Sequence, residues 1–283
     1  MTNQLVRGIQ IIPKGIVLPR VRYLSKAQVQ AYQQRIKTDY KDKALRSLDV
    51  ISFDDRTQEP QGSNPFVLYE LIRQGITPAS IATLETLVET NPEALKDRYE
   101  DYLAQVIRTP EDSYKKNNPI IADLLKQAKT KFPVLISGKL DLVNADNDYG
   151  LSLKLTDQTT VIHAPKLAYE NSGRRFIKLD ERGIPIFLSD EEIAQLREEE
   201  RNKLRTFYAK SDGLSGLYLL RSLGLYSNGD DLDDSVSGGR VVVESAEGAQ
   251  ENFRQQLISQ YQKQQQEAQL KFERAMKVLE GKE

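Results

Sequence analysis

The chain has 283 residues, of which 29% are charged and 39% hydrophobic, and its mean hydropathy is −0.54. Its 40 Lys and Arg residues nearly balance its 41 Asp and Glu residues, which excludes a chain that binds polyanions over its whole surface. It has no cysteine, so disulfides and thiolate chemistry are excluded, and no apolar run approaches the roughly 18 residues of a membrane span. The N-terminus lacks the continuous apolar region of a secretory signal. We therefore expect a soluble protein without membrane contacts, located in the cytoplasm or incorporated in a phage particle.

Residues 1–24 are predicted to be an extended basic arm. Pro13 and Pro19 each follow a short apolar run, and proline removes a hydrogen-bond donor that a central strand needs. Residues 1–50 hold ten Lys and Arg residues against three Asp and Glu residues. Such an excess fits a solvated helix face, or a contact with phosphate or with an acidic neighbouring subunit. We expect any contact with nucleic acid to be made through this arm alone.

Residues 25–132 are predicted to form a helical region that packs as a bundle. Ser25 is suited to cap a helix that reaches about Leu48. Three further helices are indicated by a capping residue followed by proline, at Asn64-Pro65, Thr77-Pro78 and Asn91-Pro92. Gly75 is expected to end the first of these, and the third has an apolar face made by Leu95, Tyr99, Tyr102, Leu103 and Val106. A last helix is predicted over about 119–131.

Residues 133–247 are predicted to be a β-rich, antiparallel module, because their apolar residues alternate in short pieces separated by turn-rich sequence. One of these turns has the alternate oxygen spacing of a calcium loop, with Asn144, Asp146 and Asp148. Tyr149 stands where such a loop needs glycine, so a β-hairpin turn is favoured. Further on, Ser189-Asp190-Glu191-Glu192 is a capping box that begins a charged helix to about Ala209.

The segment 217–244 is the most informative part of the chain. Its alternating pattern predicts a strand whose buried face carries Leu217, Leu219, Leu223 and Leu225. The opposite face of that strand then presents Tyr218, Leu220, Ser222 and Tyr226. The loop that follows is either a solvated acidic loop or, less well supported, a Ca²⁺ site made by Asp230, Asp231, Asp233 and Asp234. Because Tyr and Asn supply contact area and adaptable hydrogen bonds at low entropic cost, we predict that this segment presents a binding surface.

Residues 248–283 are predicted to form a long amphipathic helix of the coiled-coil type. Mostly apolar residues recur at spacings of three and four, namely Phe253, Leu257, Tyr261, Gln264, Ala268, Phe272, Ala275 and Leu279. This period near 3.5 drives a supercoil, so we expect the 253–279 stripe to pair with a protein partner or with a second copy of the chain. The predicted fold class is therefore α+β, with an N-terminal helical bundle, a β-rich antiparallel module and a long C-terminal coiled-coil-like helix.

No catalytic constellation is present in the sequence. His163, the one histidine, lies in a predicted strand. The sequence contains neither a Gly-x-Ser-x-Gly elbow nor a cysteine, so it offers no nucleophile that this histidine could activate as a base. Glycine-rich phosphate loops and Cys and His clusters for zinc are absent as well. We predict a protein that is not an enzyme and that holds no cofactor and no metal. A metal-dependent hydrolase that uses the acidic loop is the weakest alternative, since no base or nucleophile accompanies those aspartates.

The stretch L-x-L-Y-S-N-G-D-D-L-D-D-S-V-S-G-G-R-V-V-V, from Leu223 to Val243, resembles the closing part of C-type-lectin-like domains. It is similar in particular to the variable proteins of diversity-generating retroelements, over about 30 residues. The resemblance implies a ligand-binding surface on a stable scaffold, with variable positions at Tyr218, Leu220, Ser222, Tyr226, Asn228, Asp230, Asp231 and Asp234. The predicted function is a non-enzymatic binding or assembly protein of a phage or mobile element. The alternative is a structural subunit of a larger particle, in which this segment is an ordinary strand, turn and strand and assembly uses the basic arm and the terminal helix.

Overall fold

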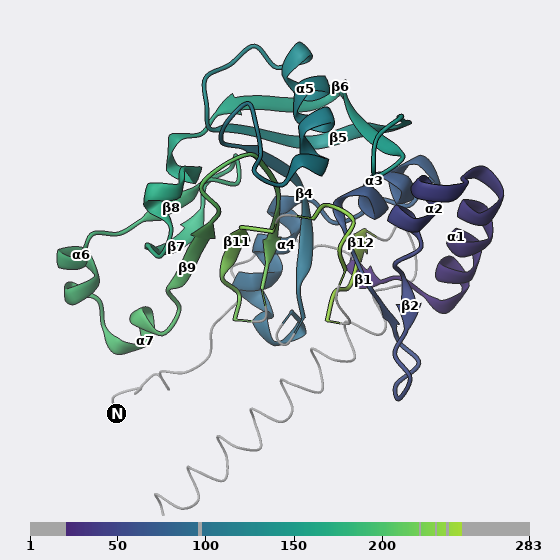
Figure 1. The fold of residues 1–283 in the computed structure, drawn as a ribbon. Helices are drawn as coiled ribbons and strands as arrows, with labels where there is room; N and C mark the ends of the chain where they lie inside the picture. The colour runs from purple at the N-terminus through teal and green to yellow at the C-terminus, as the bar shows by residue number, and fades with distance from the viewer. Residues whose placement is uncertain (1–20, 96–97, 221, 230, 236–237, 245–283) are drawn as a thin grey trace, which may run out of the picture.

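A computed structural model describes residues 21–244 of the chain except 96–97, 221, 230 and 236–237 (Figure 1). Its α-helices are α1 (Lys26–Asp39), α2 (Asp42–Leu48), α3 (Pro65–Arg73), α4 (Ile81–Thr90), α5 (Asn118–Gln127), α6 (Asp190–Gln195) and α7 (Glu198–Arg201). Its strands are β1 (Val21–Tyr23), β2 (Ser52–Phe53), β3 (Pro60–Gln61), β4 (Glu100–Ile107), β5 (Val134–Asn144), β6 (Leu151–His163), β7 (Arg175–Leu179), β8 (Pro185–Phe187), β9 (Arg205–Ala209), β10 (Leu214–Leu219), β11 (Leu225–Ser227) and β12 (Val242–Glu244). None of the helices in this described part is long and apolar enough to cross a bilayer.

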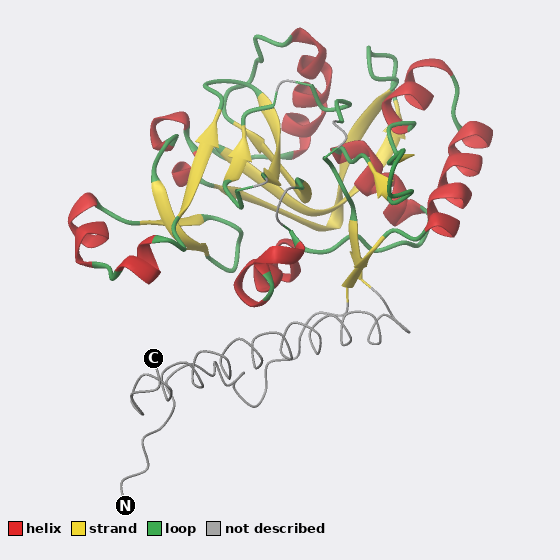
Figure 2. Cartoon of the chain, turned by 90° about the horizontal axis from the view of Figure 1, so that it is seen from below, coloured by secondary structure: helices red, strands yellow, loops and turns green. Residues whose placement is uncertain are grey.

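An eight-stranded mixed sheet organises the described residues, in the order β6-β5-β4-β10-β11-β9-β7-β8. Strands β9 and β11 run parallel to each other, and the other neighbours in the sheet are antiparallel. Outside this sheet, β1 pairs with β12 and brings the two ends of the described chain together (Figure 2). Strands β2 and β3 form a hairpin.

Two hydrophobic clusters lie on the two faces of the sheet. The first contains residues of α1, α2, α3 and α5 packed against β5 and β6, including Val29, Phe66, Ile120, Ile136 and Leu153. The second packs α4 against β4, β9, β10 and β11, and includes Leu84, Tyr102, Phe207, Leu219 and Leu225. Because side chains alternate between the faces of a strand, the central strands contribute to both clusters.

Several predicted helix boundaries are confirmed. The Asn64 side chain accepts a hydrogen bond from the Val67 amide and begins α3, and Gly75, with a φ of +80°, follows its end. The Ser189 capping box is present at the start of α6. The predicted turn between 144 and 151 joins β5 and β6 as a hairpin.

The fold-class prediction of a separate helical bundle beside an antiparallel module is wrong. The segment expected to be the third helix of the bundle has only a short 3-10 helix, Pro92–Ala94, and then forms strand β4, which lies between β5 and β10 in the mixed sheet. Tyr102, Ala104 and Val106 belong to the second cluster, whereas Leu103 packs against the first. A strand that is covered on both faces lacks the polar alternation that marks half-buried strands, so its apolar residues were read with helical spacing.

Two other long helices were also predicted wrongly. The expected helix over 25–48 is divided into α1 and α2, and Asp42 at the break has a φ of +48°. The charged helix expected to reach Ala209 is instead two short helices, α6 and α7, which are followed by strand β9. The predicted arm before residue 21 and the coiled-coil-like helix over 248–283 lie outside the described residues.

The segment that begins at Leu217 is a hairpin and not one continuous strand. Strand β10 ends at Leu219, and the Leu220 amide donates to the Gly224 carbonyl at 3.0 Å before β11 begins. Leu223 lies in this turn with a φ of +61° and is only partly buried. The other leucines of the predicted buried face, Leu217, Leu219 and Leu225, are buried in the second cluster as expected.

Candidate binding site

The hairpin places Tyr218 directly opposite Tyr226. On one strand, eight residues would separate these rings by about 26 Å, at roughly 3.3 Å per residue. Instead they are Cα partners in the β10–β11 register, and their ring centroids are 5.8 Å apart with an interplanar angle of 31°. Tyr208 of β9 continues the row, with its ring 4.5 Å from that of Tyr226 and tilted by 32°. We call these three residues the tyrosine row.

Asp101 extends this row onto the next strand. It is the Cα partner of Tyr218 across β4 and β10, so the two side chains leave the sheet on the same face. The second hydrophobic cluster occupies the opposite face, where Tyr102 and Leu219 lie. The row therefore lies on the same side of the sheet as the first cluster, and its outer member Tyr208 keeps 37% of its surface exposed.

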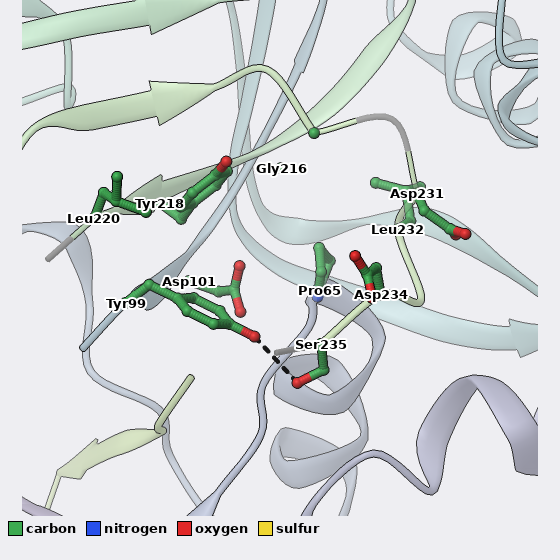
Figure 3. Close-up of a pocket in the computed structure, with 11 residues that line it drawn as sticks. Pro65, Tyr99, Asp101, Gly216, Tyr218, Leu220, Asp231, Leu232, Asp234 and Ser235 are labelled. Atoms are coloured by element: carbon green, nitrogen blue, oxygen red, sulfur yellow. Dashed lines mark hydrogen bonds between the residues drawn. The ribbon is translucent and has the colours of Figure 1, made fainter. Parts of the chain in front are cut away.

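A pocket of about 180 Å³ is lined by Tyr218, the member of the row that is partnered with Asp101, and by Asp101 itself (Figure 3). Its walls come from the start of α3, from the residues before and within β4, from β10, and from the 229–235 loop. Gly216 of β10 helps to keep it open, because a Cβ atom there would lie 3.1 Å from the Pro65 ring. We call this cavity the tyrosine pocket.

Tyr99 forms a second aromatic wall. Its ring lies edge-on to that of Tyr218, with centroids 6.2 Å apart and an interplanar angle of 69°. Its hydroxyl donates to the Ser63 carbonyl at 3.1 Å and lies 3.1 Å from the Ser235 Oγ, the contact drawn in Figure 3. The Ser63 amide in turn donates to that Oγ at 2.8 Å, so the loop that closes the pocket is tied to the start of α3.

Asp101 is one of the carboxylates that line the pocket, and it lies beside Tyr99 and Tyr218 (Figure 3). The Ser63 hydroxyl donates to its Oδ2 at 2.5 Å. Within the described part of the chain, no Lys, Arg or His forms an ion pair with it. Burial raises its pKa to about 6, and the hydrogen bond from Ser63 offsets only part of this effect.

The acidic loop supplies further carboxylates at the pocket. Asp231 accepts from the Tyr114 hydroxyl at 2.9 Å and lies 3.7 Å from Lys116 Nζ. Burial and the neighbouring Asp231 raise the pKa of Asp233 to about 6. Asp234 is exposed and lines the pocket. The cavity is thus bordered by carboxylates and tyrosine rings, a combination that attracts a cation and repels an anion.

The predicted binding residues fall into three groups. Tyr218, Leu220, Asp231 and Asp234 line the pocket. Tyr226 stacks on Tyr218, and Asn228 accepts a hydrogen bond from the Tyr218 hydroxyl at 2.8 Å. Ser222 is exposed at the hairpin turn and does not line the pocket, and Asp230 lies outside the described residues.

Sequence reasoning missed the half of the pocket that comes from other parts of the chain. Tyr99 and Asp101 were assigned to a helix, where residues two apart point in different directions. In an extended segment they share one face, so the alternation of Tyr99, Asp101 and Leu103 is the signal that could have revealed them. Pro65 and Gly216 could not be recognised as site residues from their residue types, because they only shape the wall of the pocket.

Other candidate chemistry does not converge on this site. His163 is exposed at the end of β6, and its Nδ1 lies 3.0 Å from the Lys131 carbonyl oxygen. Over the residues that the structure describes, no group of three or more His, Asp and Glu side chains is placed to hold a metal ion. Comparison with protein-family models, with curated proteins and with solved structures found no match for this chain.

Proposed function

We propose that this chain is a non-enzymatic binding protein whose tyrosine pocket takes a cationic group. The observation that carries the proposal is Asp101, a carboxylate that lines the cavity with one hydrogen bond from Ser63 and without an ion pair in the described chain. A partly buried carboxylate without a cation is unfavourable for folding, because it loses water and gains little in return. Ionisable groups whose pKa is shifted by burial cluster at functional sites.

The aromatic walls of the pocket also favour a positively charged ligand. A cation over the face of a tyrosine ring gains roughly 0.5–2 kcal/mol, more when it is desolvated. Tyr218 and Asp101 are cross-strand partners, so one ligand group can contact the ring and the carboxylate together. The pocket of about 180 Å³ is smaller than the roughly 300–1,000 Å³ of sites for drug-sized ligands. Its size suits a single side chain or a small head group.

Isothermal titration calorimetry tests this proposal with small probes of matched shape. Methylguanidinium and propylammonium are expected to bind to the full chain, whereas the neutral amide propionamide is not. Asp101→Asn is expected to abolish the binding of both cations, and Asp141→Asn, at an exposed position of β5, is the matched control. Cation binding that survives Asp101→Asn, or equal binding of propionamide, would contradict the proposal.

The resemblance to retroelement variable proteins adds a separate proposal about the origin of the site. It is supported by the position of Tyr218, Leu220, Asp231 and Asp234, four of the implied variable positions, at one pocket. If the segment is diversified, the surrounding nucleotide sequence is expected to contain an adenine-rich near-copy of the codons for 217–240 and a reverse transcriptase gene. Finding neither would remove diversification and leave the cation site unaffected.

Assembly into a larger particle is the alternative function. It depends on the basic arm and on the 253–279 stripe, most of which lie outside the described residues. Light scattering after size-exclusion chromatography tests it on the full chain and on a chain that ends at Gly248, beyond β12. A lower molar mass per particle for the shorter chain is expected if the stripe mediates assembly, and an unchanged mass would contradict that role.

A further inference from the structure

Tyr218 is the member of the tyrosine row that lines the pocket. Tyr226 lies on the β11 side of Tyr218, and Tyr208 lies beyond it, with interplanar angles near 30° in both pairs. On the other side of Tyr218 is β4, which carries its partner Asp101. The three rings therefore form a row of tilted aromatic contacts that ends at the pocket, where a flat group could lie against Tyr218 and beside the Asp101 carboxylate.

The position of Tyr218 is fixed by three contacts. Tyr226 stacks behind its ring, Tyr99 meets it edge-on, and Asn228 accepts a hydrogen bond from its hydroxyl at 2.8 Å. A ring that is held in this way offers a surface that is already ordered, so a ligand loses little free energy in arranging it. Tyr226 and Asn228 are in this sense positioning residues, since they act through Tyr218.

We infer that the cationic group is the guanidinium of an arginine side chain carried by a protein partner, stacked on Tyr218 and hydrogen-bonded to Asp101. This inference rests on the proposed function and narrows its ligand class. Guanidinium is planar and weakly hydrated, so its face can continue the stack while its edge donates hydrogen bonds to the carboxylate. The ammonium of lysine is a compact, strongly hydrated charge without a face, and it can use only one of these two features well.

The acidic loop distinguishes arginine in a peptide from free arginine. Asp231 and Asp234 line the pocket together with Asp101. The α-carboxylate of the free amino acid would be repelled by these groups, whereas a residue within a peptide has neutral amides on both sides. The volume of about 180 Å³ accommodates one side chain, so the partner's backbone would remain outside. The ligand is therefore a peptide segment that inserts a single arginine.

The test uses four probes on the full chain, with affinities measured by calorimetry. N-acetyl-arginine amide is expected to bind at least about tenfold more tightly than N-acetyl-lysine amide, a difference of about 1.4 kcal/mol. N-acetyl-glutamine amide, which is neutral, is expected not to bind, and free arginine is expected to bind more weakly than its blocked amide.

The other possible outcomes contradict different parts of the proposal. Equal or tighter binding of the lysine amide would overturn the arginine inference and leave the cation site standing. Free arginine that binds as tightly as the blocked amide would overturn the assignment to a protein partner. Absence of binding by either cationic amide and by methylguanidinium would count against the proposed function itself.

Substitutions of Tyr218 separate stacking from folding. Tyr218→Phe keeps the ring and is expected to retain the preference for the arginine amide, whereas Tyr218→Leu is expected to reduce that preference to near parity with lysine. Tyr169→Leu, at an exposed tyrosine outside the pocket, is the matched control and is expected to behave as the native chain. Thermal unfolding of each variant verifies that it is folded. A Tyr218→Leu protein that is folded and keeps the full arginine preference would overturn the stacking role.

Discussion

Tyr218 and Asp101 are direct cross-strand partners on one face of the sheet, where an aromatic ring stands next to a carboxylate without an ion pair in the described chain. Two segments that are more than 100 residues apart in the sequence build this pair, and Asp231 and Asp234 line the same pocket.

Asp101→Asn is expected to stabilise the protein at neutral pH. The folded-state pKa of Asp101, about 6, lies above its ordinary value of 3.8, so the protonated form favours folding. This contribution is fully present below about pH 3.8 and is lost as the pH rises through about 6. Because a pKa difference of one corresponds to about 1.4 kcal/mol, the substitution should raise the free energy of unfolding at neutral pH by about 1–3 kcal/mol.

Urea denaturation of both proteins over a range of pH measures this effect. The stability difference between Asp101→Asn and the native chain should shrink as the pH falls from neutral through about 6 towards 3.8. Asp141→Asn, at an exposed position of β5, is the matched control. A native chain that is more stable than Asp101→Asn at neutral pH would mean that the charged carboxylate supports the fold.

Tyr226→Leu is expected to weaken the binding of guanidinium probes, although the side chain of residue 226 does not contact them. The substitution removes both stacking contacts of this ring, to Tyr208 and to Tyr218, and should lower the free energy of unfolding by about 1 kcal/mol. Without its support Tyr218 can rotate, so affinity falls although the pocket residues are intact. Calorimetry with methylguanidinium, with Tyr169→Leu as control, measures the loss. Unchanged affinity would show that the stack does not position Tyr218.

Gly216→Ala is expected to narrow the pocket. The new methyl group would lie 3.1 Å from the Pro65 ring, closer than ordinary contact, at a position without the positive φ that would strain the backbone. The free energy of unfolding should fall by about 1 kcal/mol, in the range of mild overpacking, while methylguanidinium affinity falls more clearly. If affinity is preserved, the ligand does not enter the cavity beside Gly216.

The buried pair of Lys210 and Asp112 is expected to hold the start of β10. Lys210 Nζ lies 2.8 Å from Asp112 Oδ1, and the Leu214 amide donates to Asp112 Oδ2 at 2.9 Å. Burial alone would raise the pKa of Asp112, but the hydrogen bonds from Asn117, Lys210 and backbone amides outweigh it and hold the pKa below its usual value. Asp112 is therefore ionised at neutral pH.

Lys210→Met should accordingly reduce the free energy of unfolding by about 3–5 kcal/mol, because it leaves a buried carboxylate without its cation. Lys126→Met, which breaks the exposed pair with Asp123, should cost less than about 1 kcal/mol. Chemical denaturation compares the two variants. Similar losses in both would show that the buried pair contributes no more to stability than a surface pair.

The parts of the fold that the sequence predicted are those encoded by neighbouring residues. Asn64 and the Ser189 capping box each act within one helical turn, so α3 and α6 begin where they were expected. The sequence around strand β4 favours a helix because apolar residues face distant helices on both faces of the sheet, so the alternation of Tyr99, Asp101 and Leu103 is only a weak strand signal. The hairpin between β10 and β11 depends on a positive φ at Leu223, a residue type that gives no turn signal.

The difference between features encoded by neighbouring residues and features that depend on distant ones also explains which part of the site could be predicted. Tyr218, Leu220 and the acidic loop lie in one segment with an unusual composition, so their common surface was anticipated. Asp101 is an ordinary aspartate in the sequence and acquires its character only from its partner strand β10 and from Ser63. Its role becomes visible when the sheet register is known.

The most direct test of a cation site at Asp101 is an NMR titration of its side-chain carboxyl carbon, with and without saturating methylguanidinium. The carboxyl group should titrate at about 6 in the free protein. Because a bound cation favours the ionised form, the ligand should lower this pKa to below about 5, a coupling of at least about tenfold. An Asp101 pKa that is the same in the presence and absence of the ligand would contradict the account.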